Sequence, residues 1–158
     1  NEPDDSLIQS LVDNIVCLHQ NAEKFDDDSP WGTPKVVLQP MLDNFTTLSK
    51  FPSFSAETLK QINALSTWTD EKAEILAPVV LQRKADGFVR ACHGDLHMDN
   101  IAVIDQQAVL FDGIEFNHQF RCIDVISDLS FLIVDLIYRG NQALAFQILS
   151  LYLHQTQD

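Results

Sequence analysis

The sequence predicts an α+β fold that is mainly α-helical and carries one small β-hairpin. Three observations lead to this prediction. Apolar residues recur every three or four positions over much of the chain, short strand-like runs occur only between residues 88 and 111, and a polar turn separates the last two of these runs. With 158 residues, 46% of them hydrophobic, the chain is long enough to form one globular unit around its own core.

The first half of the chain, residues 1–86, is expected to be helical. Asp5 or Ser6 can cap a first helix that ends near Lys24, with an apolar stripe made by Leu7, Leu11, Ile15 and Leu18. The stretch from Phe25 to Lys50 is rich in Asp and Pro, which break regular structure. It therefore predicts a surface excursion with one or two helical turns around Met41–Leu48.

Two further helices are expected before the strands. Ser55 is a suitable N-cap for the first of them, whose inward residues would be Leu59, Ile62 and Leu65. The second would run from Asp70 to Lys84 and would contain Pro78. Because proline removes a backbone donor and crowds the preceding turn, we expect a kink or a junction at that position.

Three short strands are predicted next, and two helices complete the chain. The strands are expected at Phe88–Cys92, Ile101–Ile104 and Ala108–Phe111, with the last two paired as a hairpin. A helix from Ile123 to Arg139 should end at Gly140, and an amphipathic helix should follow it. The loop and hairpin region thus spans residues 88–117, and the C-terminal helices span residues 120–158.

The charge of the chain excludes some classes of partner. The formal net charge is -13, without a cluster of Lys or Arg, which disfavours nucleic acid and anionic membrane surfaces because both are bound through basic side chains. The acidity would suit a cationic small-molecule substrate, or it would simply keep the protein dispersed. Cys17, Cys92 and Cys122 lack close pairs, which predicts reduced thiols and a cytoplasmic location.

The polar residues between His93 and Asp112 predict the chemistry. Asp95 lies five residues before Asn100, and Asp112 follows the second strand of the hairpin. Phosphoryl transfer from ATP needs a carboxylate that orients and deprotonates the attacking hydroxyl, and hard oxygen ligands that hold Mg²⁺ against the phosphates. One Asp for the first task, with an Asn and a second Asp for the other, is the layout of a kinase catalytic loop.

These motifs resemble those of a known superfamily. The stretch His93-Gly94-Asp95-Leu96-His97-Met98-Asp99-Asn100 resembles the H-G-D-x-x-x-x-N loop of aminoglycoside phosphotransferases and choline kinases, and Phe111–Phe116 resembles their metal-binding segment. The segments Ile123-Asp124-Val125 and Asp128-Leu129-Ser130-Phe131 resemble the D-[LI]-A segment that follows. The resemblance implies a protein-kinase-like C-terminal lobe, with Asp95 as catalytic base and Asn100 and Asp112 as Mg²⁺ ligands. By the same resemblance, His93 shapes the loop on the ATP side of the site.

The run from Phe88 to Gly140 is most similar to a bacterial branch of uncharacterised "aminoglycoside phosphotransferase family enzymes", some joined to a P-loop kinase-like domain. The implied function is ATP- and Mg²⁺-dependent phosphorylation of a hydroxyl group on a small molecule. Nothing in the chain resembles the nucleotide-binding N-terminal lobe. We therefore expect residues 1–158 to be a partial C-terminal lobe, inactive alone, from a longer protein. Asp99 stands where the branch usually has a small residue, which places an extra carboxylate beside Asn100.

Two other functions are compatible with the sequence. The chain could be a non-catalytic module, derived from a kinase, that binds or regulates a neighbouring domain. It could also be a metal-dependent hydrolase that uses His93, Asp95 and His97, because imidazole and carboxylate groups suit zinc or iron. For Asp124 and Asp128, helix capping and hydrogen bonds to the backbone of the catalytic loop are the expected roles.

Overall fold

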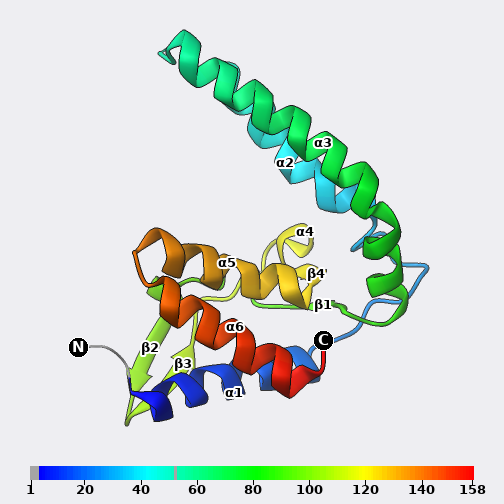
Figure 1. Cartoon of the computed structure of the whole chain (residues 1–158). Coiled ribbons are helices and arrows are strands. Elements are labelled where there is room, and N and C mark those ends of the chain that lie inside the picture. Colours follow the sequence, from blue (N-terminus) through cyan, green and yellow to red (C-terminus); the bar gives the residue numbers. More distant parts are fainter. Residues whose placement is uncertain (1–3, 52) are drawn as a thin grey trace. The chain divides into compact units, whose positions relative to one another are not determined.

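The computed structural model describes residues 4–51 and 53–158, and it confirms an α+β, mainly helical chain (Figure 1). The contacts divide the chain into two compact units. One contains residues 4–25 together with Phe88–Asp158, and the other contains Asp26–Gly87. The sequence predicted one globular unit, whereas the helices of the first half of the chain are shared between two units.

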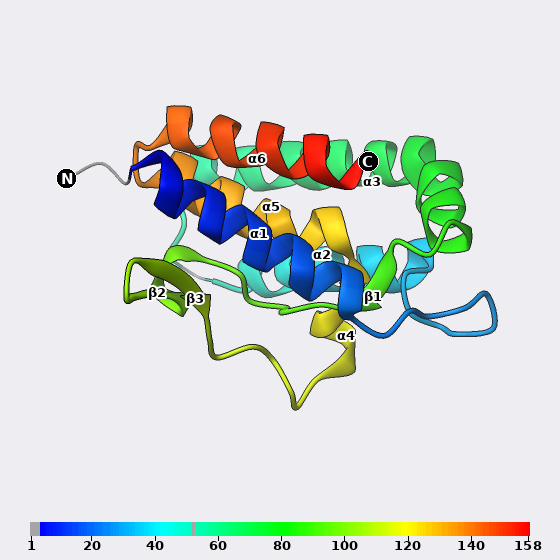
Figure 2. The same cartoon turned by 90° about the horizontal axis from the view of Figure 1, so that it is seen from below.

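The first unit contains the candidate site. Its helices are α1 (Asp5–Asn21), α4 (His118–Arg121), α5 (Val125–Tyr138) and α6 (Gln142–Thr156), with a 3₁₀ turn, η1 (Met98–Asn100). Its strands are β1 (Val89–Ala91), β2 (Ile101–Ile104), β3 (Gln107–Leu110) and β4 (Cys122–Asp124). Figures 1 and 2 show α6 alongside α1 and α5, and the hairpin β2–β3 beside α1, in agreement with the contacts between these elements.

The core of this unit forms where the apolar faces of α1, α5 and α6 meet. Its fully buried members include Val12, Ile15, Leu129, Leu132 and Ile148. The predicted helices at both ends of the chain are confirmed, with small shifts of their bounds. The N-cap of α1 is Asp4, one residue earlier than predicted, and its carboxylate accepts a hydrogen bond from the amide of Leu7 at 2.8 Å.

Two small antiparallel sheets flank the loop of residues 92–100. The hairpin β2–β3 is confirmed, with Ile101 opposite Leu110, and Asp105 and Gln106 take positive φ angles in its turn. The second sheet pairs β1 with β4, so that Ala91 lies opposite Cys122. Strand β4 and helix α4 were not predicted, because three or four residues carry too little periodicity to be recognised. The β1–β4 pair holds the start of the loop beside the start of α5.

The second unit consists of two packed helices, α2 (Pro34–Leu48) and α3 (Ala56–Ala85), which lie side by side in both views (Figures 1 and 2). The prediction of one or two helical turns around residues 41–48 is wrong, because α2 extends over 15 residues. Its Pro34 lies at the start of the helix, where the missing N–H group would have no partner in any case.

The prediction of two separate helices over residues 55–84 is also wrong, because α3 is continuous over 30 residues. Pro78 lies inside it. Figures 1 and 2 show that α3 bends in its C-terminal part, which agrees with the kink predicted from this proline. Leu59 and Leu65, which were predicted to face inward, are exposed. Near the C-terminal end of α3, the buried Lys84 donates through its Nζ atom to the carbonyl oxygens of Asp27 and Ser29. No helix over residues 4–51 or 53–158 has both the length and the apolar character needed to cross a membrane.

Candidate functional site

The loop that follows β1 is anchored by a buried carboxylate of α5. Asp128 is fully buried, and its two oxygens accept hydrogen bonds from the backbone amides of His93, at 3.1 Å, and Gly94, at 2.8 Å. Asp124 caps the same helix by accepting from the amide of Ile126 at 2.9 Å. Both predicted roles are confirmed. Asp128 holds the backbone of the loop, and Asp124 caps the helix.

Asp128 is also connected to α1 and α6 by hydrogen bonds that involve His19 and Tyr152, two residues that were not predicted from the sequence. His19 contacts Asp128 through Nε2 at 3.0 Å and the hydroxyl of Tyr152 through Nδ1 at 2.7 Å. Because the carboxylate accepts, Nε2 is the donor, and Nδ1 of a neutral ring accepts from Tyr152. Burial raises the pKa of Tyr152, so its hydroxyl keeps the proton that it donates. The only sequence signal was a histidine on the apolar stripe of the first helix.

Gly94 lets the loop turn at this anchor. Its φ is +83°, and an added Cβ would lie 2.9 Å from the backbone oxygen of Phe120. Gly140 has the same φ, but an added Cβ there would meet nothing within 4 Å. A non-glycine residue would therefore meet the same backbone strain at both positions, and its Cβ would have a steric conflict only at position 94.

The substitution Gly94→Ala is expected to destabilise the protein more than Gly140→Ala. The shared left-handed backbone costs about 1 to 2 kcal/mol in each variant, and overpacking adds about 1 to 3 kcal/mol in Gly94→Ala alone. Urea unfolding of both variants measures the difference. Equal destabilisation would mean that the loop at residue 94 can move away from Phe120.

The structure brings Asp95 and Asn100 together. The side-chain amide of Asn100, which is buried, donates to the backbone oxygen of Asp95 at 2.9 Å and to its Oδ2 at 3.2 Å. The side chain of Asp95 is nonetheless 47% exposed, so a solute can reach it. Asn100 thus holds an accessible carboxylate in position, and its amide oxygen remains the atom suited to a hard cation.

Backbone contacts tie Asp112 to the same loop. The amide of Phe111 donates to the oxygen of Asn100 at 3.1 Å, and the amide of Ile114 donates to the oxygen of His93 at 2.8 Å. The His93 Nε2 atom lies 2.9 Å from the oxygen of Phe111, which makes it the donor. Asp112 is exposed and has a φ of 60°, a conformation that few non-glycine residues adopt. The backbone segments that carry Asp112, His93 and Asn100 are therefore held together.

An outer layer of charged residues surrounds Asp95. The Nε2 atom of His97 lies 3.4 Å from the Oδ2 atom of Asp95. Asp99, the unusual carboxylate beside Asn100, is paired with Arg139 of the segment after α5, at 2.8 Å. Arg139 also binds Asp135 at 2.9 Å, and Asp135 accepts from the amide of Met98 at 3.0 Å. The carboxylates of Asp99 and Asp135 thus share one neighbouring cation.

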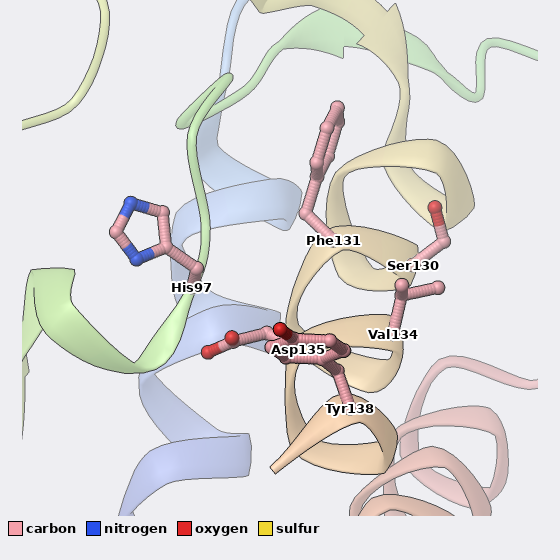
Figure 3. Close-up of a pocket in the computed structure, with 6 residues that line it drawn as sticks. All are labelled: His97, Ser130, Phe131, Val134, Asp135 and Tyr138. Atoms are coloured by element: carbon pink, nitrogen blue, oxygen red, sulfur yellow. The ribbon is translucent and has the colours of Figure 1, made fainter. Parts of the chain in front are cut away.

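A pocket of about 430 Å³ opens beside this layer (Figure 3). It is lined by His97 and by five residues of α5, namely Ser130, Phe131, Val134, Asp135 and Tyr138. In Figure 3 the carboxylate of Asp135 extends from α5 toward the loop that carries His97. The pocket and the carboxylate of Asp95 therefore have His97 as a common neighbour.

The donor atoms of His19, Cys92 and Asp128 lie within 4.8 Å of one another, and such atoms can bind zinc. The arrangement favours a hydrogen-bonded cluster instead. Both ring nitrogens of His19 and both oxygens of Asp128 already take part in hydrogen bonds, and burial, together with the nearby Asp128 and Asp124, raises the pKa of the Cys92 thiol. Among the residues of 4–51 and 53–158, His93, Asp95 and His97 do not form such a group. In His93 the Nε2 atom already donates a hydrogen bond to the backbone oxygen of Phe111. Its Nδ1 atom is buried without a hydrogen-bond partner in the described structure.

No protein-family profile matches the chain, and no solved structure is significantly similar to it. The chain is similar to an uncharacterised protein, Rv2004c, of Mycobacterium tuberculosis and to an uncharacterised protein, Mb2027c, of Mycobacterium bovis. In each case 23% of the residues are identical over 99% of this chain. It spans about a third of the length of these relatives, 31% in each. The similarity extends over the whole chain but assigns no activity.

Proposed function

We propose that the whole protein to which this chain belongs is an ATP- and Mg²⁺-dependent phosphotransferase, with a protein-kinase-like C-terminal lobe, that acts on a small-molecule hydroxyl. The observation that carries the proposal is the contact between Asp95 and Asn100. An accessible carboxylate held by a buried amide, with Asp112 on an adjoining backbone segment, supplies the groups that phosphoryl transfer requires.

Each residue has a distinct role in this proposal. The Asp95 carboxylate accepts the proton of the attacking alcohol and orients its oxygen toward the γ-phosphate of ATP. The side-chain oxygen of Asn100 and the carboxylate of Asp112 would hold Mg²⁺, which neutralises charge on the phosphates. His93 keeps the segment around Asp112 beside the loop through its hydrogen bond to Phe111. The nucleotide-binding lobe is expected elsewhere in the whole protein.

The substitution Asp112→Asn tests the metal site. Loss of one anionic ligand should raise the Mg²⁺ concentration needed for half-maximal ATP turnover by at least about 10- to 100-fold, the range seen when an outer-shell partner is lost. The measurement is ATP consumption by the full-length protein, with a panel of small alcohols, titrated with Mg²⁺.

Asp105→Asn provides the matched control. Asp105 is also an exposed aspartate with a positive φ, 50° against 60° for Asp112, but it lies in the turn of the β2–β3 hairpin. Backbone effects of the substitution should therefore be similar at the two positions. If both variants keep the Mg²⁺ dependence of the parent protein, Asp112 is not a ligand. If no alcohol stimulates ATP turnover and the protein still acts as a partner of another domain, the non-catalytic module is favoured.

A further inference from the structure

We propose that the pocket between His97 and α5 binds the acceptor alcohol, and that it selects an alcohol with an uncharged, apolar body, such as an aryl or branched alkyl group. This inference rests on the proposed phosphotransferase function and specifies its substrate class. It differs from the expectation, drawn from the net charge, that the substrate is cationic.

The side chains of α5 that line the pocket are mainly apolar. Phe131, Val134 and Tyr138 follow one another at intervals of three and four residues, so they lie on one face of the helix, and all three are exposed. Exposed apolar residues that occur singly need no explanation, but three on the wall of one pocket form a surface that an apolar group can cover. The volume of about 430 Å³ falls within the range of small-molecule sites.

The acidic residue of the lining is already engaged by a neighbouring cation. Both oxygens of Asp135 bind Arg139, at 2.9 and 3.0 Å, and one also accepts the amide of Met98. Burial raises the pKa of Asp135, but the hydrogen bonds from Arg139 and Met98 outweigh it and lower the pKa. Arg139 also pairs with Asp99, so one cation is shared by two carboxylates and the group keeps a net charge of -1. A cationic substrate would have to compete with Arg139 for the carboxylate of Asp135.

The pocket lies next to the proposed base. His97 lines the pocket, and its Nε2 atom is 3.4 Å from Oδ2 of Asp95. Its Nδ1 atom accepts from the amide of Asp99 at 3.3 Å, so a neutral ring carries its proton on Nε2, facing Asp95. An alcohol whose body covers Phe131 and Val134 can therefore direct its hydroxyl past His97 toward the carboxylate.

Binding and turnover of three small alcohols test the inference in the full-length protein. The probes are 2-phenylethanol, which is aryl and neutral, choline, which is cationic, and xylitol, which is polar and neutral. Titration calorimetry should give a dissociation constant for 2-phenylethanol at least about tenfold lower than for the other two, because its ring removes more uncharged apolar surface from water. Equal or tighter binding of choline or xylitol would overturn the inference.

The variant Phe131→Ala should weaken binding of 2-phenylethanol by about tenfold, through loss of an aromatic contact. Phe146→Ala is the matched control, because Phe146 of α6 is 51% exposed, against 49% for Phe131, and does not line the pocket. Equal weakening in both variants, or in neither, would show that the ring binds elsewhere. Thermal unfolding of both variants verifies that they remain folded.

The two hypotheses fail in different ways. If the protein phosphorylates choline or xylitol but not 2-phenylethanol, the inference about the pocket is wrong and the phosphotransferase function stands. If 2-phenylethanol binds in a manner that depends on Phe131 but no alcohol is phosphorylated, the proposed function is wrong. The pocket would then be a binding site for apolar groups without the phosphotransferase activity. Phosphorylation of 2-phenylethanol that falls in Phe131→Ala and not in Phe146→Ala supports both.

Discussion

Substitution of Asp95 by asparagine is expected to lower the rate of phosphoryl transfer by about 10²- to 10⁴-fold, the usual contribution of a general base. An amide has the shape of a carboxylate but cannot take up the proton of the alcohol. The asparagine oxygen can still accept the hydrogen bond that Asn100 donates at 3.2 Å, so the loop should keep its conformation. The measurement is kcat for the full-length protein with ATP, Mg²⁺ and the best alcohol of the panel.

Asp99→Asn is the control for this experiment. Asp99 lies on the same loop, but its side chain is 69% exposed and faces Arg139, which also binds Asp135. Removal of its charge should change kcat by only a few-fold, since the remaining partner keeps Arg139 in place. Comparable rates for Asp95→Asn and the parent protein would remove Asp95 from the role of base. Equal losses in Asp95→Asn and Asp99→Asn would point to the charge of the loop as a whole.

Substitution of Asp128 by asparagine is expected to lower the free energy of unfolding by about 1 to 3 kcal/mol for each buried donor that loses its acceptor. Its two oxygens accept from His19 and from the amides of His93 and Gly94, and the side chain is fully buried, away from bulk solvent. An amide offers one oxygen and turns two N–H groups toward these donors. Denaturant unfolding of the purified protein measures the loss.

The neighbouring substitution Asp124→Asn separates this effect from a general effect of charge at the start of α5. Asp124 is the N-cap of α5, and asparagine is an equally good cap, so the cost should be under about 1 kcal/mol. Hydrogen exchange gives a local readout: the amides of His93 and Gly94 should exchange faster in Asp128→Asn only. Unchanged exchange at these amides would contradict the assignment of Asp128 as the anchor of the loop.

The parts of the fold that were predicted correctly share one property, which is that each buries a face. The helices α1, α5 and α6 carry apolar stripes that meet in one core, and the hairpin β2–β3 has a polar turn between two short apolar strands. The helices α2 and α3 bury little, and Leu59 and Leu65 are exposed. Apolar periodicity therefore indicated less about α2 and α3, in which Pro40 and Pro78 lie without ending either helix.

For the candidate site, the sequence by itself determined the order of Asp95, Asn100 and Asp112 along a loop and a hairpin, because these residues are close in the chain and a short loop limits how far apart they can lie. Only the tertiary structure decided how that loop is held. His19, Asp128 and Tyr152 come from three helices, and more than 100 residues separate His19 from each of the other two. A hydrogen bond between such distant residues depends on how the helices pack. That packing results from the sum of many weak apolar contacts, and no local pattern in the sequence records it.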